Sequence, residues 1–206
     1  MTIRHHKNDL PDLSRYQSAD AVAVDSETLG LNLLRDRLCV VQLSPGDGTA
    51  DVVQIDRGQI DAPNLKTLLT DPSKTKIFHY ARFDVAMLRR NLGIEVSPVW
   101  CTKIASKLTR TYTDRHGLKD ITRELLGVDL SKQQQSSDWA ADELTDAQLA
   151  YAASDVLHLH DLKAKLEFML QREERTHLAE ACFRFLPVRA ELDLMGWEDT
   201  DMFAHS

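Results

Sequence analysis

The sequence of 206 residues lacks a long hydrophobic run, an apolar N-terminal segment and a metal-binding pattern of cysteines. No apolar stretch approaches the roughly 20 residues that cross a bilayer, so we expect no membrane-spanning helix and no membrane partner. The N-terminus, MTIRHHKNDLPDL, has no apolar segment of the kind found in secretory signals. Cys39, Cys101 and Cys182 are odd in number and have apolar neighbours, which predicts buried, reduced thiols in a cytoplasmic protein.

Positive charge is also scarce. The chain has 25 Lys and Arg against 32 Asp and Glu, a net charge of −7, which argues against binding a long nucleic acid along the whole surface. Residues 100–123 differ, because they hold six basic and two acidic residues. A local cationic surface suits a small anionic ligand, although solvated helix faces would explain the same charges.

The chain shows no repeat, low-complexity tract or linker, so we expect residues 1–206 to form a single domain. Strands are predicted from Val22, at 37–44 and at 50–55, with short connections typical of an antiparallel meander. Strands at 76–80 and 97–101 then alternate with helices at 64–70, 82–93 and 117–127. From about residue 146 the chain is predicted helical almost to Leu186, with a break at Pro187. This order predicts an α/β fold in which helices cover a mixed sheet.

Two carboxylates end the first of these strands. In the stretch VAVDSETLGL, Asp25 and Glu27 follow buried strand residues, and no Lys or Arg occurs before Arg35. Side chains two residues apart on a strand point to the same side, so these anions would repel each other and resist burial. They are expected to hold a cation.

Two further acids are unusually placed. Asp84 follows HYARF at the start of a helix, where capping alone would explain an aspartate. Asp155 lies within an apolar helix, where aspartate has poor propensity, and Tyr151 is one turn earlier on the same face. Carboxylate oxygens are the preferred ligands of Mg²⁺ and Mn²⁺, and two such ions about 4 Å apart can bind a phosphoryl group.

The segments DSETLG, HYARFD and YAASD resemble the three motifs of the DEDD 3′–5′ exonuclease superfamily. Tyr151 is similar to the tyrosine of the DEDDy branch, which includes ribonuclease D and proofreading exonuclease domains. The segment HGLKDITRELLGVDLSKQQQSSDW also resembles ribonuclease D. This resemblance implies a ribonuclease-H-like fold. Ser26 stands where the family commonly has threonine and Tyr80 where it often has asparagine, and neither position is a metal ligand.

A narrower resemblance concerns chain length. Ribonuclease D has helical HRDC domains after its exonuclease domain, and this sequence of 206 residues has no room for them. The segments RDRLCVVQLS and DLMGWEDTDMFAH are similar to the family of short alphaproteobacterial oligoribonucleases called nanoRNase C. That resemblance implies cleavage of short RNA, above all 5′-phosphorylated dinucleotides, by a homo-oligomer that is a ring-like octamer.

The resemblance also implies roles for individual residues. Asp25, Glu27 and Asp155 would hold the metal that activates water, and Asp25 would bridge to a second metal near Asp84. Tyr151 would orient the attacking water, because a tyrosine with an ordinary pKa is a poor base at neutral pH. The candidate substrate-binding residues are Leu29, Gly30, Leu31, His79, Arg82 and Trp139. Leu31 would be an apolar wedge against a base, or else a core residue, and Trp139 would shape the pocket wall.

Two alternatives remain open at this point. One is a general ribonuclease D-like or DNA-directed exonuclease acting on longer strands, since contacts to the 2′-hydroxyl cannot be identified from the sequence. The other is a catalytically silent nucleic-acid-binding protein with the same fold. The presence of all four acids and the tyrosine argues against the second alternative.

Overall fold

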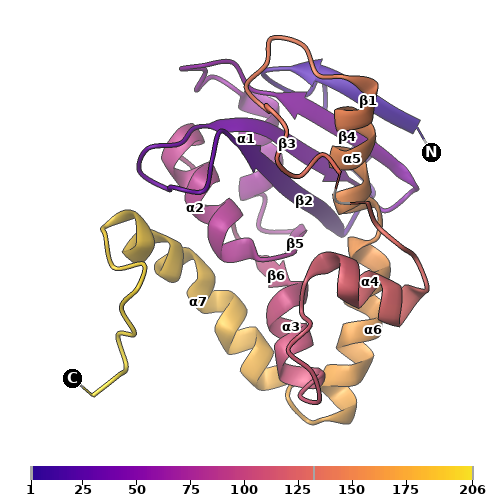
Figure 1. Cartoon of the computed structure of the whole chain (residues 1–206), viewed down its shortest axis with the longest axis vertical. Coiled ribbons are helices and arrows are strands. Elements are labelled where there is room, and N and C mark those ends of the chain that lie inside the picture. Colours follow the sequence, from indigo (N-terminus) through magenta and orange to yellow (C-terminus); the bar gives the residue numbers. More distant parts are fainter. Residues whose placement is uncertain (1, 132, 206) are drawn as a thin grey trace.

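The structure, a computed structural model, describes residues 2–131 and 133–205. Its centre is a six-stranded mixed sheet with the order β1-β4-β3-β2-β5-β6 (Figure 1). The strands are β1 (Thr2–Lys7), β2 (Ala21–Thr28), β3 (Leu38–Ser44), β4 (Thr49–Gln54), β5 (Thr75–Phe78) and β6 (Val99–Cys101).

Strands β2, β3 and β4 form the predicted antiparallel meander, in which Asp25 pairs with Gln42 and Val41 with Val53. Strands β5 and β6 then join in parallel, with β5 beside β2. The predicted mixed sheet is therefore confirmed. Strands β5 and β2 are parallel neighbours. The loop that follows β5 therefore lies beside the carboxyl end of β2.

Strand β1 was not predicted, because its sequence TIRHHK is polar and does not alternate. It pairs in parallel with β4 at the sheet edge. The buried carboxylate of Asp51 on β4 accepts hydrogen bonds from Arg4 at 2.7 Å and from the Tyr16 hydroxyl at 2.7 Å, and His6 Nε2 lies 2.8 Å away. These polar contacts, made between residues far apart in the sequence, stabilise the edge strand.

In residues 2–131 and 133–205, seven α-helices accompany the sheet. They are α1 (Pro63–Thr70), α2 (Ala81–Leu92), α3 (Thr102–Thr109), α4 (Leu118–Leu126), α5 (Asp146–Leu157), α6 (Leu159–Arg172) and α7 (Thr176–Leu194). Helix α3 was not predicted. Helix α2 ends at Gly93 and α4 at Gly127, both in the left-handed conformation, as expected for helix C-caps. A capping box between Thr145 and Gln148 begins α5.

The predicted break at Pro187 is wrong, because α7 continues through it to Leu194. Proline inside a helix removes one hydrogen bond, so tertiary contacts must offset its cost. Helix α7 packs along α2, and near its end the buried Asp193 accepts hydrogen bonds from Arg82 and Arg189. These contacts keep the last turns helical.

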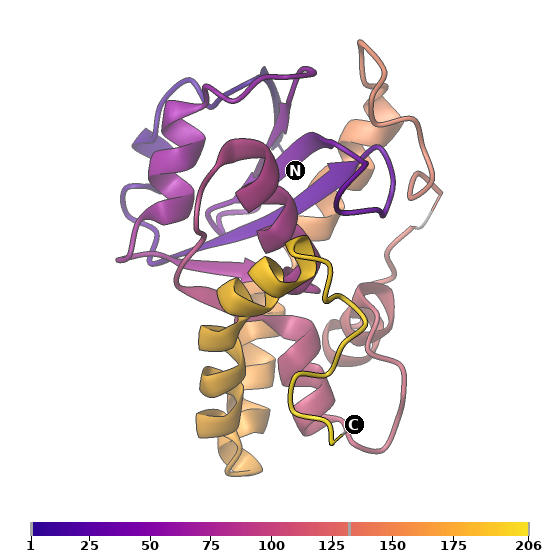
Figure 2. The ribbon, with the colours of Figure 1, turned by 90° about the vertical axis from the view of Figure 1, so that its left-hand side faces the viewer.

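Helix α5 covers one face of the sheet and α1 and α2 cover the other, as Figures 1 and 2 show. The alternation of strand residues follows this division: Val40 and Val52 pack in the cluster beneath α5, and Val41 and Val53 pack in the main core. Helices α3, α6 and α7 pack beside β5 and β6, beyond that edge of the sheet.

Two further expectations concern cysteines and membranes. Cys39 and Cys101 are buried as predicted, whereas Cys182 is exposed on α7, because its apolar neighbours in the sequence point to other sides of the helix. Among the helices in the described parts of the chain, none is both long and apolar enough to span a membrane.

Candidate active site

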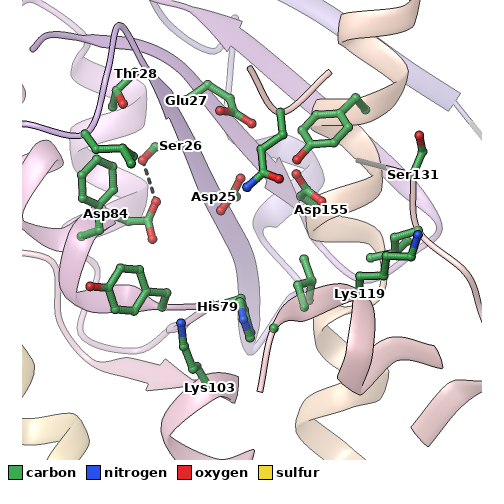
Figure 3. A pocket seen from close by; sticks show the side chains of 18 residues that line it. Asp25, Ser26, Glu27, Thr28, His79, Asp84, Lys103, Lys119, Ser131 and Asp155 are labelled. Atoms are coloured by element: carbon green, nitrogen blue, oxygen red, sulfur yellow. Dashed lines mark hydrogen bonds between the residues drawn. The ribbon is translucent and has the colours of Figure 1, made fainter. Parts of the chain in front are cut away.

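Five predicted residues meet in one cavity. Asp25 and Glu27 lie on the last half of β2, Asp84 is in the first turn of α2, and Tyr151 and Asp155 are one turn apart on α5. All five side chains line a cavity of about 340 Å³ between the end of β2, α2, α4 and α5 (Figure 3). The fold therefore assembles these side chains from three distant segments.

Three of the acids are placed to share a cation. One carboxylate oxygen from each of Asp25, Glu27 and Asp155 lies within 4.8 Å of the others. A donor set made only of carboxylate oxygens suits a hard divalent ion such as Mg²⁺ or Mn²⁺. Within the described residues, this trio is the cluster of potential ligands close enough to hold one metal ion. Asp84 is not part of it.

Asp84 is held by a neighbour that the sequence analysis did not assign to the site. The Ser26 hydroxyl donates a 2.6 Å hydrogen bond to Asp84 Oδ1, drawn as a dashed line in Figure 3. Ser26 lies between the two acids of β2, so it points away from them and toward α2. The sequence did offer a sign of this role, because Ser26 lies inside the first motif, where the family that the chain resembles commonly has a hydroxyl side chain.

Burial raises the pKa values of all four carboxylic acids, and repulsion from neighbouring acids adds to the rise for Asp25, Glu27 and Asp84. For Asp25 burial is the largest cause, followed by the charges of Asp84, Asp155 and Glu27, and the pKa lies well above its ordinary value. Burial likewise raises the pKa of Glu27 to about 9 and those of Asp84 and Asp155 to about 7. A cation at the trio would favour the ionised forms, so the electrostatics as well as the geometry fit a bound metal.

Tyr151 is kept protonated by its surroundings. Burial first, and then the charges of Asp155, Glu27 and Asp25, raise the pKa of its hydroxyl. Its ring lies against Trp139, with ring centroids 6.0 Å apart. Trp139 is 3% exposed and does not line the cavity, so it supports Tyr151 from behind.

The remaining wall of the cavity is mixed in character. Leu31 lines it with 84% of its surface exposed, which rules out the alternative that Leu31 is a core residue. Lys103 from α3 and Lys119 from α4 also line it, and the Lys103 ammonium lies 4.3 Å from the ring centroid of Tyr80. These two lysines belong to the cationic segment 100–123, but the sequence did not indicate which of its six cations face the site.

His79 reaches the cavity without a charge. Its Nδ1 lies 2.8 Å from the Thr102 hydroxyl, and burial lowers its pKa to about 3. At neutral pH it is therefore an uncharged hydrogen-bonding group, so it would contact a phosphate or ribose without contributing positive charge.

Three other predicted substrate-binding residues lie away from the cavity lining. Leu29 lines a separate groove beside Arg35 and Arg37. Gly30 packs against the carboxylate of Asp36, and a Cβ at this position would lie 2.4 Å from Asp36 Oδ2. Arg82 donates to both oxygens of Asp193, at 2.6 and 2.8 Å, so its guanidinium faces α7.

The fold and this cavity define a class of protein. A family model described as 3′–5′ exonuclease matches residues 7–171, and the chain belongs to this family. Ribonuclease D from Gluconacetobacter diazotrophicus is 32% identical over 163 residues, which cover 79% of this chain and 41% of that protein. DNA polymerase I from Aquifex aeolicus is 35% identical over 160 residues, covering 77% and 25%. The chain thus spans about two fifths or less of the length of these curated relatives.

Solved structures extend the likeness to the full chain. NrnC from Brucella melitensis bound to pGG is 68% identical, with both chains covered completely and a TM-score of 0.97. The same protein with bound Mg²⁺ is 67% identical with a TM-score of 0.96. Escherichia coli RNase D is 27% identical, covers 84% of this chain and 46% of its own, and has a TM-score of 0.75. The predicted ribonuclease D-like exonuclease fold and the resemblance to nanoRNase C are confirmed.

Proposed function

We propose that the chain is a metal-dependent 3′–5′ exoribonuclease that cleaves short oligoribonucleotides, above all 5′-phosphorylated dinucleotides, to mononucleotides. The observation that carries this proposal is the full-length likeness, at 68% identity, to an NrnC that binds pGG. The acidic cavity supports it, because its volume of about 340 Å³ suits a small ligand better than a long strand. Residues 1–206 would then act as one exonuclease domain.

Two divalent cations, Mg²⁺ or Mn²⁺, are the cofactors of this proposal. Asp25, Glu27 and Asp155 would hold one ion, and Asp25 together with Asp84 would hold the second. When bound, the ions lower the pKa of water and stabilise the charge of the leaving oxygen. The compact trio supports the first site. The Ser26 hydroxyl bonds to Oδ1 of Asp84, so Oδ2 can act as a metal ligand. This supports the second metal site.

Tyr151 would position the attacking water and would not act as a base. Its raised pKa keeps a proton on the hydroxyl at neutral pH in the metal-free protein. The contact with Trp139 restrains the ring, so the hydroxyl stays near Asp155, one helical turn away. Trp139 is then a positioning residue that acts through Tyr151.

The substrate would lie across the cavity with its scissile phosphate at the acids. In Figure 3 Lys119 and Ser131 lie on one side of the acidic cluster, and Thr28, Ser26 and Asp84 lie on the other. The Lys119 side suits the 5′ phosphate of a dinucleotide, because an ammonium group lines the cavity there. Lys103, the other cation in the described lining, lies against Tyr80. Leu31, exposed on the opposite side, would pack against a base.

A homo-oligomer, with an octamer as the expected size, is part of the proposal. Several large apolar side chains of α7 and the segment after it are exposed, among them Leu178, Val188, Met195 and Trp197. Exposed apolar surface of this kind is typical of protein–protein contacts. Light scattering of the purified chain tests this part, and a monomer would contradict it.

The decisive experiment for the activity is a time course with 5′-labelled RNAs of two to twenty nucleotides, with Mg²⁺, with Mn²⁺ and with EDTA. We expect kcat/KM to be highest for dinucleotides, a strong loss on removal of the 5′ phosphate, and no activity in EDTA. Rapid degradation of the 20-mer with dinucleotides accumulating would favour the ribonuclease D-like alternative. Equal cleavage of a DNA dinucleotide would contradict RNA selectivity, and binding without cleavage would favour the silent protein.

A further inference from the structure

A second hollow opens beside the acidic cavity. It has a volume of about 200 Å³ and is lined by Leu31, Leu33, Tyr80, Arg82, Phe83, Asp193, Glu198 and Asp199. Leu31, Tyr80 and Phe83 also line the acidic cavity. Because three side chains are shared, the two spaces adjoin, and a molecule extending past Leu31 and Phe83 would enter the second hollow.

The second hollow is acidic. Asp193, Glu198 and Asp199 contribute three carboxylates, and Arg82 is the single cation in the described lining. Asp193 accepts hydrogen bonds from both Arg82 and Arg189, so these three side chains together carry one positive charge. Glu198 and Asp199 outnumber that charge by one, so the lining together with Arg189 is net negative, unlike the side of the acidic cavity that carries Lys119.

The turn that carries these acids is anchored to the body of the protein. Arg82 on α2 donates to the Glu198 carbonyl as well as to Asp193. Arg189 on α7 donates to the carbonyls of Trp197 and Thr200, and also to Asp193, which is 1% exposed. Two arginines thus fix residues 197–200, so the acids border the hollow in a defined place. Arg82, predicted to bind substrate, acts as a positioning residue for this turn.

The second hollow lies next to the expected position of the 3′ end of the substrate. If the 5′ phosphate lies toward Lys119, as in the proposed function on which this step rests, the 3′-terminal nucleoside lies toward Leu31 and Phe83. The group attached to its 3′ oxygen then points toward the acidic turn. A 3′-hydroxyl is uncharged, whereas a 3′-phosphate or a continuing strand brings negative charge against Glu198 and Asp199, which is unfavourable at short range.

We propose that Glu198 and Asp199 make the enzyme select RNA ends that carry a 3′-hydroxyl, by repelling a phosphate on the 3′ side of the cavity. The two residues determine specificity and do not touch the reacting atoms. They would also prevent a strand from continuing through the cavity, which restricts cleavage to chain ends.

The test compares two 5′-phosphorylated diribonucleotides of one sequence, one with a 3′-hydroxyl and one with a 3′-phosphate. Wild-type enzyme should cleave the 3′-phosphorylated form more slowly. The double variant Glu198→Gln/Asp199→Asn should raise kcat/KM for that form by about three- to tenfold relative to the 3′-hydroxyl form. The gain should shrink as NaCl is raised, because salt screens exposed charges.

The matched control is Glu143→Gln/Glu180→Gln, which removes the same charge from exposed positions outside both linings. It should leave the ratio of the two substrates unchanged. An equal ratio in the double variant and the control overturns the inference while the proposed function stands. If wild type cleaves neither dinucleotide, the proposed function fails. The inference is then decided by binding of the same labelled dinucleotides, and equal affinity for both in wild type overturns it.

Discussion

Asp25 experiences the strongest electrostatic conflict among the residues of the cavity. Its carboxylate is flanked by those of Glu27, Asp84 and Asp155, and these charges together with burial raise its pKa. Among the side chains that the structure describes, its one hydrogen-bond donor is Gln42, the partner residue on β3, whose Nε2 lies 3.4 Å from Oδ2. Such a group is costly to the metal-free fold and useful only when a cation binds, so stability and function make opposite demands on it.

Asp25→Asn separates these two demands. Asparagine keeps the size of the side chain but removes a charged ligand, so turnover of a labelled dinucleotide should fall by several orders of magnitude at saturating Mg²⁺. The melting temperature in EDTA should stay the same or rise, because three repulsive pairs are lost. Asp129→Asn, a change at an exposed position after α4, is the control and should alter neither property. Retention of a tenth of the wild-type turnover would contradict the metal assignment.

At the scale of elements, the loop between β2 and β3 positions Leu31 at the cavity. The loop folds around the buried carboxylate of Asp36, which accepts hydrogen bonds from the Asn32 amide at 2.9 Å and from Arg35 at 2.7 Å. Gly30 lies so close to Asp36 that a larger residue would displace the loop. The exposure of Leu31 is therefore a consequence of how the loop folds, and the loop presents an apolar side chain to the cavity.

Leu31→Ala tests whether the Leu31 side chain contacts a base of the substrate. Covering an exposed leucine with a base contributes about 1–2 kcal/mol, so KM for a dinucleotide should rise by about five- to thirtyfold while the melting temperature stays unchanged. Leu34→Ala is the matched control, because Leu34 is also exposed on this loop but does not line the cavity. Steady-state kinetics of both variants decide the matter, and equal KM values would assign Leu31 no contact with substrate.

For the whole molecule, the acidic cavity links folding to pH and to metal. The carboxylic acids have ordinary pKa values near 4 when unfolded, and folding raises them to about 7 for Asp84 and Asp155 and about 9 for Glu27. Between these limits the folded state binds more protons than the unfolded state. The contribution of the cavity to stability therefore falls as pH rises through this window. A metal ion reverses the trend, because it binds the deprotonated form.

The melting temperature of the EDTA-treated protein should accordingly decrease from pH 6.5 to pH 8, and the increase produced by Mg²⁺ should grow over the same interval. His79 opposes this trend only near the lower end of the range, because folding lowers its pKa from about 6.5 and its contribution to stability rises with pH up to about pH 7. Asp25→Asn should reduce both slopes in differential scanning fluorimetry. An Mg²⁺ effect independent of pH would show that the ion binds elsewhere.

Local information in the sequence was sufficient for the meander, for most helices and for the four acids with Tyr151. These features depend on residue periodicity, on glycine C-caps and on short motifs, all of which are properties of neighbouring residues. The polar edge strand β1 was not predictable in this way, because its pairing depends on Asp51, more than forty residues away. Pro187 misled the prediction for a similar reason, since contacts with α2 outweigh the local cost of proline.

The sequence by itself therefore determined which groups the candidate site contains: carboxylates, most of them without nearby basic residues, and a tyrosine on the same helix face as the last of them. Only the tertiary structure decided which long polar side chains serve the site. It directs Lys103 and Lys119 into the cavity, turns Arg82 toward Asp193 and places Ser26 on Asp84. The physical reason is that a flexible polar side chain satisfies its charge or hydrogen bonds with whatever group the fold brings within reach, and that group is usually distant in sequence.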